Sequence, residues 1–151
     1  VVGIAQAAYT VARMVAPNFS VVYVLDRSEQ VIRESLHLHG MERFCKSCRS
    51  TGLGVLDFDR DPQAGLRALA EQGRKCVKED GAECVVLGCA GFVQFVDALN
   101  QELGVPVIDG VSPAVKLCEA LVDMGCKTSK ENLWANPEPK KILGLQDIIK
   151  F

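Results

Sequence analysis

The sequence predicts an α/β fold with a mainly parallel sheet flanked by helices. Its 151 residues, 48% hydrophobic and 24% charged, are one ordinary domain's worth of chain with enough apolar surface for a core. The strand-like segments are apolar throughout rather than alternating, which is typical of strands buried on both faces. Segments with helical spacing separate them, and this alternation along the chain favours a parallel sheet.

The first elements are a helix, a strand and a second helix. The stretch 5–15 is rich in Ala, Ile, Val and Met and predicts a helix that Pro17 ends. Residues 19–25, "FSVVYVL", are β-branched and aromatic and predict a buried strand. The following helix has Ser28 as its N-cap and Gly40 as its C-cap.

The middle of the chain is less regular. Between Met41 and Asp61 the pattern predicts only a short strand, over about 54–58. A helix then begins with Asp61 as N-cap and Pro62 at the first helical position, a strong start signal. Its apolar residues repeat at helical spacing: Leu66, Leu69, Ala70 and Cys76.

Two further strand–helix pairs follow. The apolar run 81–88, "GAECVVLG", predicts a buried strand, and 92–104 predicts a helix that ends on a glycine. Residues 105–110, "VPVIDG", form the next short strand. The last helix, 112–125, is predicted to begin with Ser112 as N-cap and Pro113 at the first helical position. Gly125 ends it. Its apolar stripe is Val115, Leu117, Leu121 and Val122.

Beyond Lys127 the periodicity is lost. We expect a tail that packs on the surface through four apolar residues, Trp134, Ile142, Leu145 and Ile148. The chain opens in mid-pattern on "VVGI" without a methionine, so we expect a fragment with an upstream part missing.

Charge and hydropathy exclude two classes of partner. A net charge of −2 argues against a nucleic acid, which needs a basic face. No apolar stretch reaches the roughly 18–20 residues that span a bilayer, so we expect no membrane partner.

The seven cysteines are odd in number and irregularly spaced, which indicates reduced thiols in a cytoplasmic protein. Cys84 and Cys118 lie in apolar segments and are expected in the core, whereas Cys76 and Cys126 are expected at or near the surface.

The stretch 87–91, "LGCAG", is the main candidate site. It places Cys89 where a strand ends and a helix begins, and ligands of parallel sheets bind at the carboxyl ends of strands. The glycines allow a sharp turn and close approach of a ligand. The positive end of the next helix lowers a cysteine pKa from about 8.5, so Cys89 is predicted to act as a base or nucleophile near neutral pH. The alternative from local pattern alone is a small buried residue without a chemical role.

Other chemistry-bearing residues form weaker patterns. Asp26 and Asp109 each follow a strand, and each is either a site residue or a cap of the next helix. A CxxC at 45–48 has no second ligand pair, so no metal site is expected. His37 and His39 lie on a predicted surface helix, which argues against a protease-like cysteine.

Several stretches together resemble a known family. "VVGIAQAAY", "FSVVYVLDRS", "GAECVVLGCAGF" and "LGVPVIDGVSPAVKLCEALVDMG" are similar to segments of the hydantoin and allantoin racemases of the aspartate/glutamate racemase superfamily. The resemblance runs from Val1 to about Leu145. It implies an aspartate/glutamate racemase-like lobe, one of two similar α/β lobes with an active site between them. It also implies racemisation without a cofactor or metal, by two cysteines from opposite lobes.

The resemblance assigns residues one by one. Cys89 matches the family's second cysteine, and Gly88, Ala90 and Gly91 match the turn whose backbone amides face the substrate. Tyr23 and Val24 stand where family members often carry two threonines that bind substrate polar groups, so the resemblance implies that these two residues bind the substrate in their place.

The family's first cysteine lies upstream of Val1. We therefore expect residues 1–110 to be the second lobe, carrying the cysteine turn. Residues 111–151 are then a C-terminal helix and tail that return to the missing first lobe.

The resulting expectation is a cofactor-independent racemase of 5-substituted hydantoins or allantoin. It acts on a small molecule and is a homo-oligomer when complete. The alternatives are an amino-acid racemase, a maleate-isomerase-like relative, a single-cysteine decarboxylase, and a non-catalytic lobe that binds a ligand.

Overall fold

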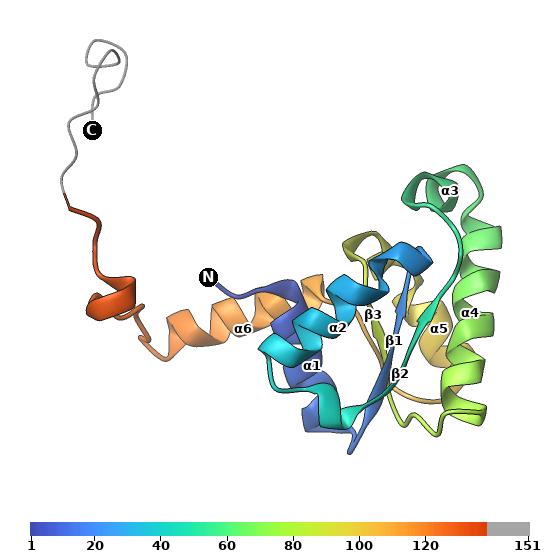
Figure 1. The fold of residues 1–151 in the computed structure, drawn as a ribbon, viewed down its shortest axis with the longest axis horizontal. Helices are drawn as coiled ribbons and strands as arrows, with labels where there is room; N and C mark the ends of the chain where they lie inside the picture. The colour runs from blue at the N-terminus through green and yellow to red at the C-terminus, as the bar shows by residue number, and fades with distance from the viewer. Residues whose placement is uncertain (139–151) are drawn as a thin grey trace, which may run out of the picture. The chain divides into compact units, whose positions relative to one another are not determined.

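A computed structural model describes residues 1–138 and confirms the α/β class (Figure 1). Four parallel strands form one sheet in the order β2-β1-β3-β4. Residues 1–120 form the compact unit that holds this sheet, and a second unit begins at Leu121. The strands are β1 (Phe19–Tyr23), β2 (Cys45–Ser50), β3 (Val85–Leu87) and β4 (Val107–Ile108).

Helices cover both faces of the sheet. Figure 1 shows α1 and α2 on one side of the strands and α4 and α5 on the other, with α3 beside α4. The helices are α1 (Ile4–Val15), α2 (Glu29–Leu38), α3 (Val55–Arg60), α4 (Pro62–Lys78), α5 (Val96–Leu103) and α6 (Val111–Asp123).

The two central strands are buried on both faces. Val21 packs into a cluster with residues of α1 and α2, while its neighbour Val22 packs into a cluster with α4 and α5. The same division separates Val86 from Val85 on β3. Every position of these strands is therefore apolar or small, which explains why the sequence shows no alternation.

The predicted helix ends are partly confirmed. The Asp61 side chain accepts a hydrogen bond from the Ala64 amide at 2.9 Å and caps α4 as expected. Gly40, with φ +66°, follows α2, but the Ser28 side chain makes no capping bond. For α6 the predicted cap, Ser112, was wrong: the Asp109 side chain accepts from the amides of residues 111 and 112. Of the two roles expected for Asp109, a site residue or a helix cap, the structure shows the helix cap.

The prediction was wrong about the strand at 54–58, which is the helix α3. The Asp57 carboxylate accepts a hydrogen bond from the Gly54 amide and fixes the first turn. Phe58 is buried there against Phe92, in space left open because Gly65 has no side chain. The fourth strand is instead β2, which was not predicted because "CKSCRS" is polar and lies at the sheet edge.

Two cysteine expectations were also wrong. All seven thiols are free. Cys84 is buried and Cys126 is exposed, both as expected. Cys76, expected near the surface, is fully buried because it lies on the sheet-facing side of α4. Cys118, expected in the core, is exposed on α6.

The apolar stripe of α6 is largely uncovered in the described chain. Val122 is 75% exposed, and Val115 is also exposed. In the tail, Trp134 is 54% exposed, and the other three predicted contacts, Ile142, Leu145 and Ile148, lie outside the described residues. Among residues 1–138, no helix combines the length and apolar character needed to cross a membrane.

A polar network joins the edge strand β2 to the end of α4. The Arg49 guanidinium donates to both carboxylate oxygens of Asp80, at 2.6 and 2.7 Å. The Ser47 hydroxyl also donates to Asp80, so the buried Ser20 hydroxyl must donate to Ser47. Arg49 thereby holds the pKa of the Asp80 carboxyl below its ordinary value.

We expect Asp80→Ala to lower the free energy of unfolding by about 1–3 kcal/mol, because charged hydrogen-bond donors lose their acceptor. Since the folded-state pKa of Asp80 is depressed, its stabilisation is present above the unfolded pKa of about 3.9 and is lost as pH falls below it. Urea unfolding at neutral and acid pH measures both effects. Glu79→Ala is the control, because Glu79 is an exposed partner of the same arginine. Equal losses in the two variants would contradict this account.

Candidate active site

A small cavity opens where β3 ends, between the first turns of α1, one side of α2 and the turn after β3. Its volume is about 150 Å³. The sheet order is β2-β1-β3-β4. The chain passes from β1 to β2 on one side, then crosses to β3 on the other side of β1. The direction of the connections therefore reverses between β1 and β3. Ligands of open parallel sheets bind at this reversal, outside the carboxyl ends of the strands. The cavity is lined by Ile4, Ala5, Ala8, Tyr9, Val31, Ile32, Ser35, Val86, Leu87, Gly88, Cys89, Ala90 and Gly110.

Gly88 holds the turn tightly against β1. Its amide donates a hydrogen bond to the Val22 carbonyl at 2.8 Å and so extends the sheet ladder by one residue. An added Cβ would lie 3.1 Å from the Tyr23 Cβ and 3.2 Å from the Val21 Cγ1. The turn thus needs glycine for close packing against β1, and this contact fixes where Cys89 emerges from the sheet.

Cys89 follows in extended backbone, with φ −144° and ψ 134°, and is half-buried. Its carbonyl accepts from the Phe92 amide and opens a 3₁₀ helix, Ala90–Phe95. The predicted α-helix therefore begins only at Val96, as α5. Phe92 and Phe95, three residues apart, fall on the same side of a 3₁₀ helix and are both buried there. The expected α-helical dipole next to Cys89 is replaced by this turn.

The Cys89 side chain packs against the apolar cluster on the α4 face, whereas the turn around it is exposed. Gly88, Ala90 and Gly91 are exposed, so the turn faces solvent on either side of Cys89. An added Cβ at Gly91 would lie 3.8 Å from the Cys89 Sγ, in ordinary contact. Glycine here is needed neither by the backbone angle nor by packing, and its effect is to leave the space beside the sulfur free.

The other two predicted site residues lie outside the cavity wall. Tyr23 is almost fully buried, and burial together with the nearby Glu29 carboxylate raises its pKa to about 12. Val24 packs toward the cluster on the α4 face, and its carbonyl accepts from the Gly52 amide. The structure therefore brings Gly88, Cys89 and Ala90 together with Gly91 beside them. A substrate-binding role for Tyr23 and Val24 stays a prediction.

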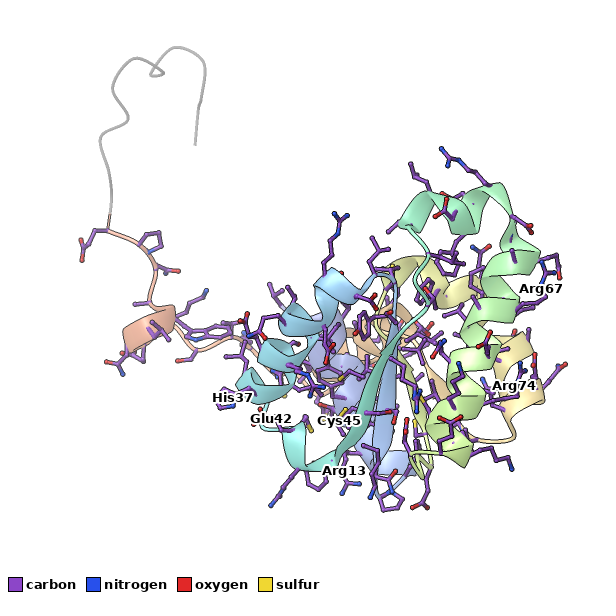
Figure 2. The ribbon with its side chains drawn as sticks, turned by 45° about the vertical axis from the view of Figure 1, so that its right-hand side comes forward. Arg13, His37, Glu42, Cys45, Arg67 and Arg74 are labelled. Carbon is purple, nitrogen blue, oxygen red and sulfur yellow. The ribbon has the colours of Figure 1, made fainter. Side chains whose placement is uncertain are left out.

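Three remaining candidates have other partners. The Asp26 carboxylate accepts a hydrogen bond from the Ser50 hydroxyl at the end of β2. His37 pairs with Glu42 at 2.9 Å on the exposed end of α2, where Figure 2 shows the two side chains next to each other. His39 stands near the Tyr9 ring. Within residues 1–138 no three His, Cys, Asp or Glu side chains are grouped to hold a metal ion.

Sequence reasoning missed the polar wall of the cavity. The Tyr9 hydroxyl donates to the Ser35 hydroxyl at 3.5 Å, and the Tyr9 ring stacks on Phe19. Burial raises the pKa of Tyr9. The available signal was that Ala5, Ala8 and Tyr9, at spacing i, i+3 and i+4, share one helix face. That spacing does not say which element the face meets.

Residues 1–118 match the family model described as Asp/Glu/Hydantoin racemase. The chain is 47% identical over 144 residues to a hydantoin racemase from Pseudomonas sp. (strain NS671), covering 95% of the chain and 58% of that protein.

Two solved structures are similar at 40% identity. An allantoin racemase from Pseudomonas fluorescens has a TM-score of 0.87, covering 93% of this chain and 60% of that one. An allantoin racemase from Klebsiella pneumoniae has a TM-score of 0.90, covering 95% and 58%. The chain thus spans 58–60% of the length of these relatives. A mutant of arylmalonate decarboxylase, at 19% identity and a TM-score of 0.59, shares the fold alone.

The cavity geometry predicts opposite effects for two glycine substitutions. At Gly110 a Cβ would lie 2.9 Å from the Ile4 carbonyl oxygen, so we expect Gly110→Ala to lower the free energy of unfolding by about 1–3 kcal/mol. We expect Gly91→Ala to leave stability within about 0.5 kcal/mol. It should instead slow alkylation of Cys89, because the methyl group stands beside the sulfur.

Urea unfolding and peptide mapping of alkylated cysteines measure the two outcomes, with alkylation of the exposed Cys126 as internal reference. Unchanged alkylation of Cys89 in Gly91→Ala would show that the sulfur is approached from another side.

Proposed function

We propose a function from one premise: the chain belongs to the Asp/Glu/hydantoin racemase family, whose model matches residues 1–118. This membership confirms the resemblance found in the sequence. The proposed function is cofactor-independent racemisation of 5-substituted hydantoins or allantoin, by proton transfer α to a carbonyl. The observation that carries it is a half-buried thiol, Cys89, opening to a cavity at the reversal point of the sheet.

Inverting a carbon centre without a cofactor needs an acid and a base on opposite sides of a planar intermediate. In this proposal Cys89, as thiolate, removes the α-proton of one enantiomer and, as thiol, returns a proton to form it. The opposite face is served by a cysteine from the missing first lobe. The open space beside the Sγ, which Gly91 leaves free, supports approach of the reacting carbon.

The neighbouring residues divide between two binding roles. The exposed turn of Gly88, Ala90 and Gly91 is proposed to offer its backbone to the ring of the substrate. Tyr23 and Val24 remain the proposed substitutes for the family's threonines. The Tyr9 hydroxyl adds a polar group at the cavity wall, since its hydrogen bond to Ser35 is long enough to exchange for a substrate oxygen.

The remaining cavity wall suits an apolar substituent. Ile4, Val31 and Ile32 face it with hydrocarbon side chains. Its volume of about 150 Å³ falls below the roughly 300–1,000 Å³ of complete ligand pockets. The size supports the view that this chain supplies one wall of a larger site.

The proposed organisation follows from that view. Residues 1–110 are the second lobe, and residues 111–151 return to a first lobe that the chain does not contain. The exposed stripe of α6 and the greater length of the relatives support this arrangement. We further propose that the protein is cytoplasmic and a homo-oligomer, acts on a small molecule, and has no nucleic-acid or membrane partner and no cofactor.

The decisive variant is Cys89→Ser in the full-length protein. We expect racemisation to fall by at least about 100-fold, because a hydroxyl is a far weaker acid and base than a thiol. In D₂O the unaltered enzyme should exchange the α-hydrogen of both hydantoin enantiomers, and the variant should lose exchange for at least one. Polarimetry and NMR measure the two rates. Cys126→Ser, at an exposed thiol, is the matched control and should retain full activity.

Unchanged racemisation in Cys89→Ser would refute the assignment. A product labelled with deuterium on one face only would indicate a single-thiol decarboxylase instead.

The lobe arrangement predicts the response of α6 to a charge. Val122→Lys in the full-length protein should lower the free energy of unfolding by about 2 kcal/mol or more, because it would bury an unpaired ammonium group. Glu119→Gln on the same helix is the control and should be nearly neutral. Urea unfolding decides between the two, and a neutral Val122→Lys would mean that α6 stays uncovered in the longer protein.

A further inference from the structure

The two cysteines of the CxxC in β2 point to the same side of the sheet. Residues three apart in a regular strand face opposite sides. Here Phe19 pairs with Cys45 and Val21 with Cys48, so β2 carries one residue more than β1 between these pairs. The extra residue of this bulge brings the two cysteine side chains to the same face of the sheet. Both thiols pack there against the apolar cluster beneath α1 and α2.

Their sulfurs lie 3.9 Å apart, and the intervening residues face elsewhere. Ser47 turns to the opposite face, where its hydroxyl donates to Asp80, and Lys46 is exposed. Both thiols are half-buried on an edge strand rather than sealed in the core. Closing the 3.9 Å gap to the usual disulfide length of about 2.05 Å requires the two thiols to turn toward each other and the bulged backbone to move the two residues closer.

A second cavity gives reagents access to the pair. Its volume is about 130 Å³, and Cys45 and Cys48 form part of its wall. The other lining residues are Arg33, Leu36, Glu42, Lys46 and Ser47.

The pair is electrostatically asymmetric. The neighbouring Cys45 thiol and the Arg33 guanidinium lower the pKa of Cys48 despite its burial and the Glu29 carboxylate. The adjacent Cys48 sulfur and burial raise the pKa of Cys45, whose thiol also donates to the Ser47 carbonyl at 3.3 Å. These opposite directions favour Cys48 as the attacking cysteine and Cys45 as the resolving one.

We propose that Cys45 and Cys48 form a reversible disulfide when the protein meets a hydroperoxide. The Cys48 thiolate attacks the peroxide; the S–O bond forms, the O–O bond breaks, and the leaving hydroxide takes up a proton as water. Cys45, after losing its proton, attacks the sulfenic sulfur. The S–S bond forms and the S–O bond breaks, releasing a second water. The dithiol loses two electrons, and hydrogen peroxide is reduced to two waters.

This modification site goes beyond the proposed racemase function. Neither thiol lines the Cys89 cavity, and the proposed racemisation assigns a role to neither. A metal at the pair is not favoured, because the described residues offer no group of three suitable ligands there.

The sequence allows a sharp test on the full-length protein. Trypsin cleaves after Arg43, Lys46 and Arg49, so Cys45 and Cys48 fall on separate tripeptides, FCK and SCR. The reduced protein is treated with hydrogen peroxide, its free thiols are alkylated, and the digest is analysed by mass spectrometry. We expect the two tripeptides to appear joined, lighter by two hydrogen atoms than their sum, and to separate again after dithiothreitol.

The variants identify the roles of the two thiols. In Cys45→Ser, Cys48 should accumulate as sulfenic acid and be trapped by dimedone. In Cys48→Ser, trapping at Cys45 should be at least about tenfold slower. The exposed Cys126 is the reference for unselective oxidation. Alkylated, separate tripeptides at a peroxide dose that already oxidises Cys126 would overturn the proposal, and so would equal trapping rates at the two positions.

Discussion

The hydrogen bond from the Gly88 amide to the Val22 carbonyl holds the end of β3 against β1, and the candidate site depends on that contact. Gly88 has side-chain atoms of Tyr23 and Val21 where its own Cβ would be, so β3 approaches β1 closely at the edge where Cys89 emerges. The thiol is thereby carried by the middle of a sheet buried on both faces. A site on such a support is positioned more firmly than one on a free loop.

A second close approach closes the cavity from the other side. Gly110, just after β4, lies so near the Ile4 carbonyl that the first turn of α1 can pack there only against a residue without a side chain. The first turns of α1 then meet α2 through Tyr9 and Ser35, and both helices line the cavity that Cys89 also lines. Gly88 and Gly110, which follow the neighbouring strands β3 and β4, thus both line the cavity and set how closely the adjoining elements approach. Residues distant in the sequence meet because the ends of parallel strands share one edge.

The sequence predicted what depends on local pattern. Non-alternating apolar runs indicated β1 and β3, and the Asp61–Pro62 pair marked the start of α4. It failed where the outcome depends on a partner element. Residues 54–58 form a helix because Phe58 finds space above Gly65, and β2 is a strand because β1 offers an edge, despite its polar residues.

For the site, the same limit applies. Cys89 and its glycines were predictable because they are contiguous. Tyr9 was not, since its place in the wall of the same cavity follows from how α1 packs on the sheet.

The chain places the same chemical group in two environments, and the surroundings separate their chemistry. Cys89 packs against the apolar cluster on the α4 face, and Gly91 leaves space beside its sulfur, which suits a reversible exchange of protons with a bound carbon acid. Cys48 has a second thiol at 3.9 Å and a guanidinium nearby, which suits capture of an electrophile and closure of a disulfide.

The helix α2 lies between the two cavities, presenting Ile32 and Ser35 to one and Arg33 to the other. Forming a disulfide between Cys45 and Cys48 would change the packing of the apolar cluster beneath this helix. Tyr9 of α1 also lines the Cys89 cavity and belongs to the apolar cluster that Cys45 and Cys48 pack against. Coupling between the redox pair and the Cys89 cavity therefore has two routes, α2 and this cluster.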